Sequence, residues 1–80
     1  MSPAEAQEVK NLLLHNNDQY RDLAQRHHKL DDRLHELLDR HYLSTSEHLE
    51  EVTLKKQKLA LKDQMERMAL DYARTHIRAS

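Results

Sequence analysis

The sequence predicts an all-α protein: an antiparallel two-helix hairpin of coiled-coil type that assembles into a helical bundle. Glycine and cysteine are absent from the 80 residues, and the only proline is Pro3. Apolar residues recur at helical spacing on both sides of one interruption, Ser44-Thr45-Ser46. A chain that lacks glycine turns and disulfides and keeps this spacing is typical of paired helices. We expect residues 1–80 to form a single unit.

The first helix is expected at about residues 3–41. Ser2 precedes Pro3, and Glu5 stands three residues after the serine. This pattern is a capping box with proline at the first helical position. Nothing up to His41 breaks a helix, and about 39 residues would extend about 58 Å at 1.5 Å per residue. A helix of that length needs a partner.

A turn is expected at about residues 42–45, and a second helix at about 45–76. Hydroxyl residues favour a turn there, and Ser44 with Glu47 matches a second capping box. Helix propensity alone leaves a continuous rod open, but the heptad patterns of the two segments mirror each other about Ser44, which favours the hairpin. The predicted seam between the helices consists of Leu13, Asn16, Tyr20, Leu23, His27, Leu30, Leu34, Leu54, Lys58, Leu61, Met65, Met68 and Tyr72.

In this register Leu34 lies beside Leu54, and Tyr20 lies beside Met68. The flanking side chains then give no like-charge pair, and exposed ion pairs, at most about 1 kcal/mol each, select a register more than they stabilise it. The flanking pairs expected are Arg40 with Glu50, Arg33 with Gln57, Arg26 with Gln64 and Asp31 with Lys55.

A second apolar stripe on the later helix predicts self-association. One hairpin cannot cover both stripes, and full burial of a single Leu or Val side chain contributes about 1.5 to 3 kcal/mol. Scattered surface leucines are normal, however, and Lys56, Asp63 and Glu66 interrupt the stripe. We expect a homo-oligomer, most simply a two-fold dimer, while a tetramer or a helical partner protein stays open. The expected interface consists of Leu49, Val52, Leu59, Leu70 and Ile77, with Val9 and Leu12 from the N-terminal overhang.

A lysine-rich segment offers an alternative function, weak binding to an anionic surface such as RNA or membrane phosphates. Lys55, Lys56 and Lys62, together with Lys58, stand within two turns of helix, but the net charge of the chain is -1. Glu51 and Lys55 also form a favourable i,i+4 pair. That face lacks aromatic side chains that stack on bases, so we expect a solvated face and no nucleic-acid partner.

Seven histidines raise the question of a metal site. His28, Asp32, His35 and Asp39 share one helical face and contain ligand types that zinc accepts. A polar stripe on an amphipathic helix is more often a solvated face, and the pattern lacks the third fixed ligand of a zinc motif. We expect neither metal nor cofactor. His27 lies in the seam, where a neutral core histidine and a pH switch both stay open.

Catalysis and membrane insertion are not expected. Ser44 and Ser46 stand near His48 but lack the pocket and the oriented base that a nucleophile needs. The longest apolar run, residues 12–14, is far shorter than the roughly 20 residues that span a bilayer. No signal-peptide pattern is present, so we expect a cytoplasmic protein.

Two segments, His28-Lys29-Leu30-Asp31 and LKKQKLALKDQM over residues 54–65, resemble the YdcH-like family of small bacterial proteins. The resemblance covers about residues 20–70. It implies an antiparallel helical hairpin of uncharacterised function and no catalytic residues. The chain departs from the family pattern in its N-terminal extension, up to about Asn17, and in its histidine content. The sequence therefore predicts a bacterial protein of uncharacterised role that acts as a homo-oligomeric interaction module.

Overall fold

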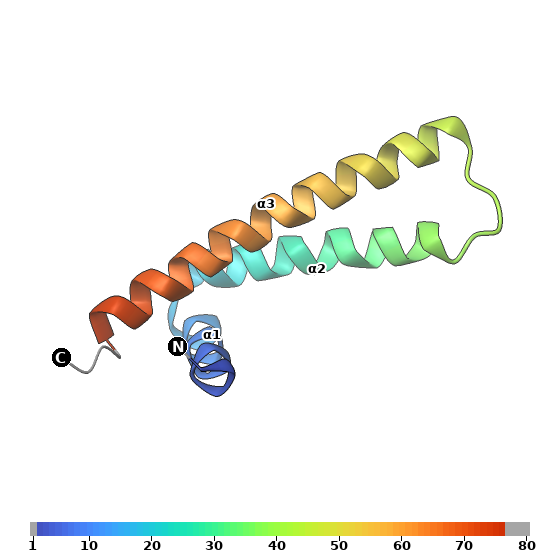
Figure 1. The fold of residues 1–80 in the computed structure, drawn as a ribbon. Helices are drawn as coiled ribbons and strands as arrows, with labels where there is room; N and C mark the ends of the chain where they lie inside the picture. The colour runs from blue at the N-terminus through green and yellow to red at the C-terminus, as the bar shows by residue number, and fades with distance from the viewer. Residues whose placement is uncertain (1, 77–80) are drawn as a thin grey trace.

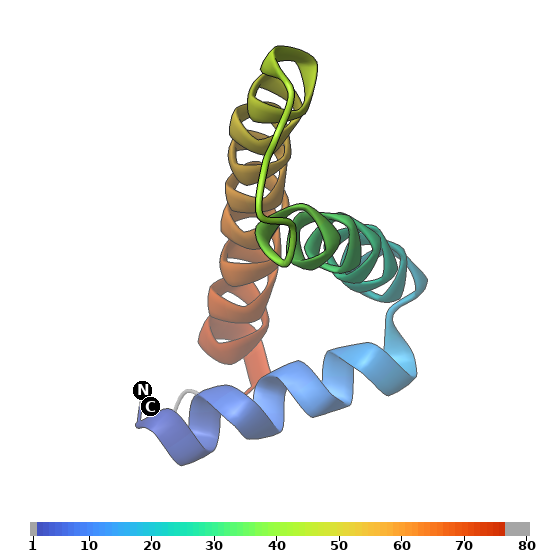
Figure 2. The ribbon, with the colours of Figure 1, turned by 90° about the vertical axis from the view of Figure 1, so that its right-hand side faces the viewer.

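The computed structural model describes residues 2–76, and three α-helices occur in that range. α1 spans Pro3–Asn16, α2 spans Asp18–Leu38 and α3 spans Thr45–His76. The described residues contain no strand, so the all-α prediction is confirmed. α2 and α3 lie side by side in opposite directions, and α1 crosses their end farthest from the 39–44 loop (Figures 1 and 2). The fold is elongated, with extents of 54 × 23 × 17 Å.

Asn17 interrupts the first predicted helix, so the prediction of one helix at 3–41 in a two-helix hairpin is wrong. The backbone of Asn17 is extended, with φ -128° and ψ 110°. The Asn17 side-chain oxygen accepts a hydrogen bond of 2.9 Å from the Tyr20 N–H, which caps the start of α2. The Asn17 N–H donates to the Leu13 carbonyl at 2.9 Å. One residue therefore satisfies backbone groups at the end of α1 and at the start of α2.

Arg21 completes this junction from the first turn of α2. Its Nε donates to the Leu14 carbonyl at 2.9 Å, and its Nη2 donates to the His15 carbonyl at 3.0 Å. These carbonyls lie in the last turn of α1 and have no partner inside that helix. The guanidinium replaces the missing hydrogen bonds, so α1 can end here and turn back across α2 and α3.

Both predicted helix-capping sites form. The Ser44 Oγ accepts from the Glu47 N–H at 3.2 Å, and the Ser44 N–H donates to Glu47 Oε1 at 3.0 Å. These reciprocal bonds make a capping box at the start of α3, and the hydrogen bond from the Ser44 backbone is the main cause that lowers the pKa of Glu47. At α1, the Ser2 Oγ accepts from the Glu5 N–H at 3.2 Å.

Two clusters of buried side chains hold the helices together. The first lies near the 39–44 loop and contains Leu34, Leu37 and Leu54, with Leu30 and Leu43 packed against it. The second lies where α1 crosses the other two helices and joins residues from all three. It contains Val9, Leu13, Tyr20 and Ala69, with Met65, Met68, Tyr72 and Ala73 packed against it. Leu34 shares a cluster with Leu54, and Tyr20 shares one with Met68, as the register expects.

The middle of the predicted seam is less well covered. His27, Leu30 and Leu61 are half-buried, as is Lys58, whereas Leu23 is buried. Asn16 does not take its predicted seam position: its side chain is exposed at the last residue of α1. The reason is the break at Asn17, which rotates α1 away from the axis that the heptad pattern continues.

The ion pairs that reach α3 from α2 and from the 39–44 loop differ from the predicted flanking pairs. Those predictions paired Arg40 with Glu50, Arg33 with Gln57 and Asp31 with Lys55. The structure instead pairs Arg33 with Glu50 at 2.7 Å, Arg40 with Glu47, and Asp31 with Lys58. A guanidinium binds a carboxylate more strongly than it binds an amide, and Arg33 therefore pairs with Glu50, about two turns nearer the loop than Gln57. For Arg26 the ion partner is Asp22 on its own helix, at 3.1 Å.

Candidate interaction surface

The outer face of α3 carries four large apolar side chains that no other helix covers. Leu49, Val52, Leu59 and Leu70 are 65%, 51%, 59% and 47% exposed. Their spacings of three, seven and eleven residues place them along one stripe of a helix. α2 contacts the opposite face through Leu54, which is only 8% exposed. We call Leu49, Val52, Leu59 and Leu70 the outer stripe.

The N-terminal residues predicted for the same interface divide between two environments. Leu12 is 39% exposed, but Val9 is fully buried within the chain, which corrects its predicted place on an intermolecular surface. Val9 is buried because α1 turns back at Asn17 and packs it into the cluster with Ala69. The remaining predicted interface residue, Ile77, lies outside the described residues.

Three exposed charged residues lie along the outer stripe: Lys56, Asp63 and Arg67, which lies about five helical turns after Leu49. Lys56 and Asp63 are exposed, and neither makes an ion pair with another residue of the described range. Glu66, one turn further, is instead half-buried and pairs with Lys10 of α1 at 3.0 Å. The open part of the stripe therefore carries two cations, Lys56 and Arg67, and one anion, Asp63, none of which has an ion partner among the described residues.

The lysines predicted as the alternative anion-binding site do not form a common surface. Lys55 pairs with Glu51 at 2.9 Å on its own helix, and Lys58 pairs with Asp31 of α2. The hydrogen bond from Lys58 is the main cause that lowers the pKa of the Asp31 carboxyl. Lys56 points along the outer stripe, whereas Lys62 lines a groove on the side of α3 that faces α1.

That groove, of about 330 Å³, lies where the three helices meet. It brings together Lys10 of α1, Tyr20 and His27 of α2, and Lys58 and Lys62 of α3. Glu66 and Asp31 neutralise two of the three lysines, so the net cationic charge is small. Burial raises the pKa of the Tyr20 hydroxyl above its usual value. The sequence pattern missed this grouping because Lys10 reaches it only through the break at Asn17.

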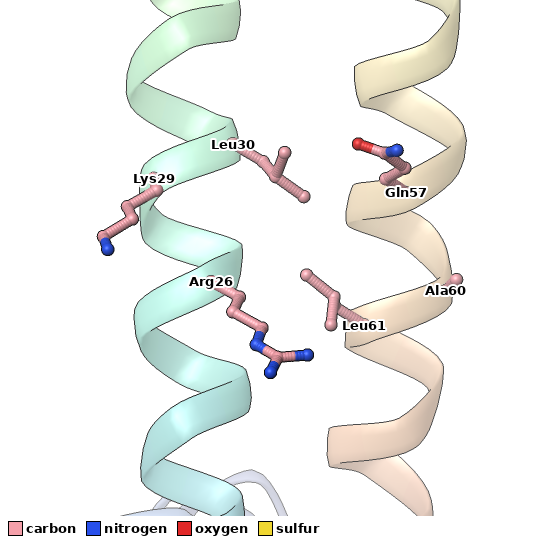
Figure 3. Close-up of a pocket in the computed structure, with 6 residues that line it drawn as sticks. All are labelled: Arg26, Lys29, Leu30, Gln57, Ala60 and Leu61. Carbon is pink, nitrogen blue, oxygen red and sulfur yellow. The ribbon is translucent and has the colours of Figure 1, made fainter.

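A second groove, of about 460 Å³, opens on the opposite side of the α2/α3 pair. Leu30 and Leu61 point toward one another across it, with Arg26 beside them (Figure 3). Gln57, Ala60 and Lys29 complete its lining. The groove leaves this part of the seam between the two buried clusters partly open, so Leu30 and Leu61 are only half-buried.

The polar stripe considered as a metal site does not gather its four residues. His28 Nε2 lies 3.4 Å from Asp32 Oδ2, but His35 Nδ1 lies 3.6 Å from the carboxylate of Asp31 instead. Asp39 takes the C-cap position of α2. Among residues 2–76, no group of three or more histidine or carboxylate side chains is placed to hold a metal ion.

Residues 21–69 match the family model described as "Protein of unknown function (DUF465)". The chain belongs to this family. Both segments that carry the YdcH-like resemblance, residues 28–31 and 54–65, fall inside the matched range. No curated protein and no solved structure matches the chain.

The DUF465 match covers most of α2, the 39–44 loop and most of α3, and it leaves out α1. Three of the four residues of the outer stripe, Leu49, Val52 and Leu59, lie within the matched range, and Leu70 follows directly after it. Over the helices of residues 2–76, no stretch combines the length and the apolar character needed to cross a bilayer.

Proposed function

We propose that this DUF465 protein is a YdcH-like homo-oligomeric module that acts through contacts between helices and not through catalysis. The observation that carries the proposal is the outer stripe of α3, four apolar side chains between 47% and 65% exposed on a single face. Each Leu or Val contributes about 1.5 to 3 kcal/mol when fully buried. A domain of this size has a net stability of only a few kcal/mol, so covering the stripe is a large gain.

The way the other helices pack supports this role. α2 occupies the face of α3 opposite the stripe, and α1 lies beside Glu66 and Ala69 without covering Leu70. The stripe is therefore the one long face of α3 that the described part of the chain leaves without a helical neighbour. A second copy on that face would give a layer of antiparallel helices, the usual geometry of small bundles.

Binding to an anionic surface is the weaker alternative. Lys55 and Lys58 are held in ion pairs, and Lys56 and Lys62 point from different sides of α3. Exposed pairs are weak, so an RNA or a lipid phosphate can still compete for Lys55. Binding of RNA at low salt that weakens steeply as salt rises would support this alternative.

The test of self-association replaces two residues of the outer stripe. Wild-type protein at tens of micromolar is expected to sediment as an oligomer, and Val52→Glu/Leu59→Glu as a monomer with a lower melting temperature. Gln57→Glu/Gln64→Glu adds the same charge at exposed positions of α3 away from the stripe and is the matched control. It is expected to remain oligomeric. A wild-type protein that is already monomeric at this concentration contradicts the proposal.

A further inference from the structure

The outer face of α3 has a symmetric pattern with opposite charges at equivalent positions. Lys56 and Asp63 lie at equal distances on either side of the midpoint between Leu59 and Ala60. Leu49 and Leu70 lie at equal distances from the same point and are both exposed. A two-fold interface requires such self-complementarity, since residue i of one copy meets residue j of the other while j meets i.

We propose that the outer stripe pairs with the same stripe of a second copy, antiparallel, about a two-fold axis that passes between Leu59 and Ala60. The proposal rests on the proposed function and specifies the partner and its register. Lys56 of each copy then lies opposite Asp63 of the other. Leu49 lies opposite Leu70 of the second copy, and the two Leu59 side chains meet near the axis. Val52 lies opposite Arg67 of the second copy, whose aliphatic stem packs on it while the guanidinium stays in water.

Neighbouring registers fit less well. A register shift of three residues, about one turn, places Leu59 opposite Asp63 of the second copy, and a shift of four residues in the other direction places it opposite Lys56. Either shift packs a leucine against a charge that loses its ion partner, which is costly. A parallel pairing stacks Lys56 on Lys56 and Asp63 on Asp63, and such like-charge contacts oppose association.

The lack of ion partners for Lys56 and Asp63 within the described chain supports the same antiparallel register. Lys56 and Asp63 have no ion partner in the described chain, although two cation-carboxylate pairs link α2 to α3 and a third joins Arg40 of the 39–44 loop to Glu47. In the antiparallel dimer each of them gains one partner, at two symmetric sites. From Leu49 to Leu70 the contact runs about 32 Å at 1.5 Å per residue, long enough for a helix pair to bury a continuous strip.

The pairing is tested by charge reversal at the two exposed positions. Lys56→Asp places two carboxylates together at both symmetric sites, and Asp63→Lys places two ammonium groups together. Each single variant is expected to raise the dimer dissociation constant at least about tenfold. The double variant Lys56→Asp/Asp63→Lys restores opposite charges and should dimerise nearly as well as wild type. Lys29→Asp, an exposed reversal on α2, is the control and should leave dimerisation unchanged.

Mixing the two single charge-reversal variants gives an independent test of the proposed register. The two single variants should associate with one another when combined, because each heterodimer contains two Asp–Lys contacts. Circular dichroism of each variant checks that the helices remain folded. Single variants that dimerise like wild type, or a double variant that stays monomeric, overturn the proposed register while leaving self-association intact. A wild-type monomer overturns the proposed function itself.

A cysteine pair defines the direction of the helices. The chain has no cysteine, so one introduced thiol per copy gives an unambiguous product. Ala60→Cys lies next to the axis and should form a disulfide-linked dimer under mild oxidation. Thr53→Cys would lie about 20 Å from its symmetry mate at 1.5 Å per residue, too far for a disulfide, and should not. Equal cross-linking of both variants would show a parallel dimer and overturn the proposal.

Discussion

Arg33 of α2 holds the carboxylate of Glu50 on α3 with two hydrogen bonds, from Nε at 2.7 Å and from Nη2 at 2.9 Å. Arg33 also donates to Glu36 one turn further along α2, at 3.0 Å. These contacts raise the pKa of the guanidinium and lower the pKa of Glu50, with the Arg33–Glu50 hydrogen bonds as the largest cause for both groups. The pair therefore links the two long helices near the cluster of Leu34 and Leu54.

This pair predicts a loss of stability in acid. The pKa of Glu50 lies below its ordinary value of 4.5 in the folded chain, so below pH 4.5 the unfolded chain binds more protons. The stabilisation is complete above that pH and is lost as pH falls through the lowered pKa. Glu50→Gln should therefore unfold more easily in urea at pH 7 and show a shallower loss of stability between neutral and acid pH.

Glu8→Gln is the control, because Glu8 is exposed and has no ion partner among the described residues. Its stability should follow the wild-type curve at every pH. Asp31 and Glu47 also have lowered pKa values, through Lys58 and Ser44, so Glu50→Gln should reduce the acid dependence without abolishing it. Identical curves for Glu50→Gln and wild type would show that the Arg33 pair does not stabilise the fold.

Asn17 is expected to stabilise the junction between α1 and α2. Its side chain accepts the Tyr20 N–H, and replacement of a capping Asn by Ala typically costs about 1 kcal/mol. Asn17→Ala should lower the free energy of unfolding by about that amount in urea titrations. Asn17→Asp keeps the acceptor and should behave like wild type. Asn16→Ala removes an exposed amide inside α1 and should have little effect, so equal losses for the two alanine variants would contradict the capping role.

The sequence was sufficient for the features that depend on local chemistry. Ser2 and Ser44 cap the helices that they were expected to start, since a hydroxyl followed three residues later by glutamate satisfies backbone donors within one turn. The pairing of Leu34 with Leu54 follows from spacing about a short loop. The exposure of Leu49 and Leu59 also follows from periodicity, because the inner and outer faces of α3 are nearly opposite.

The sequence did not reveal that α1 turns back. The 3,4 spacing of the heptad pattern runs through Asn16 and Tyr20 without a gap, and it predicts a continuous helix. Asn16-Asn17-Asp18 favours a helix break instead, because Asn and Asp prefer caps and turns to helix interiors. The contacts that stabilise the reversal of α1 join residues far apart in the chain. Val9 packs in one cluster with Ala69, and Lys10 pairs with Glu66. Periodicity within one helix carries no information about such contacts, so the groove around Lys10 and Tyr20 was missed as well.

Val9 is expected to hold α1 against the other helices. Its side chain is fully buried, and Val9→Ala removes about two methylene equivalents from the cluster, at a cost of about 2 kcal/mol. α1 should then detach more often, and trypsin should cleave after Lys10 faster than in wild type. Leu14→Ala deletes a larger group from the same helix, but Leu14 is 37% exposed and the cost should be smaller. Cleavage after Lys10 at the same rate in wild type and Val9→Ala would show that α1 does not depend on this contact.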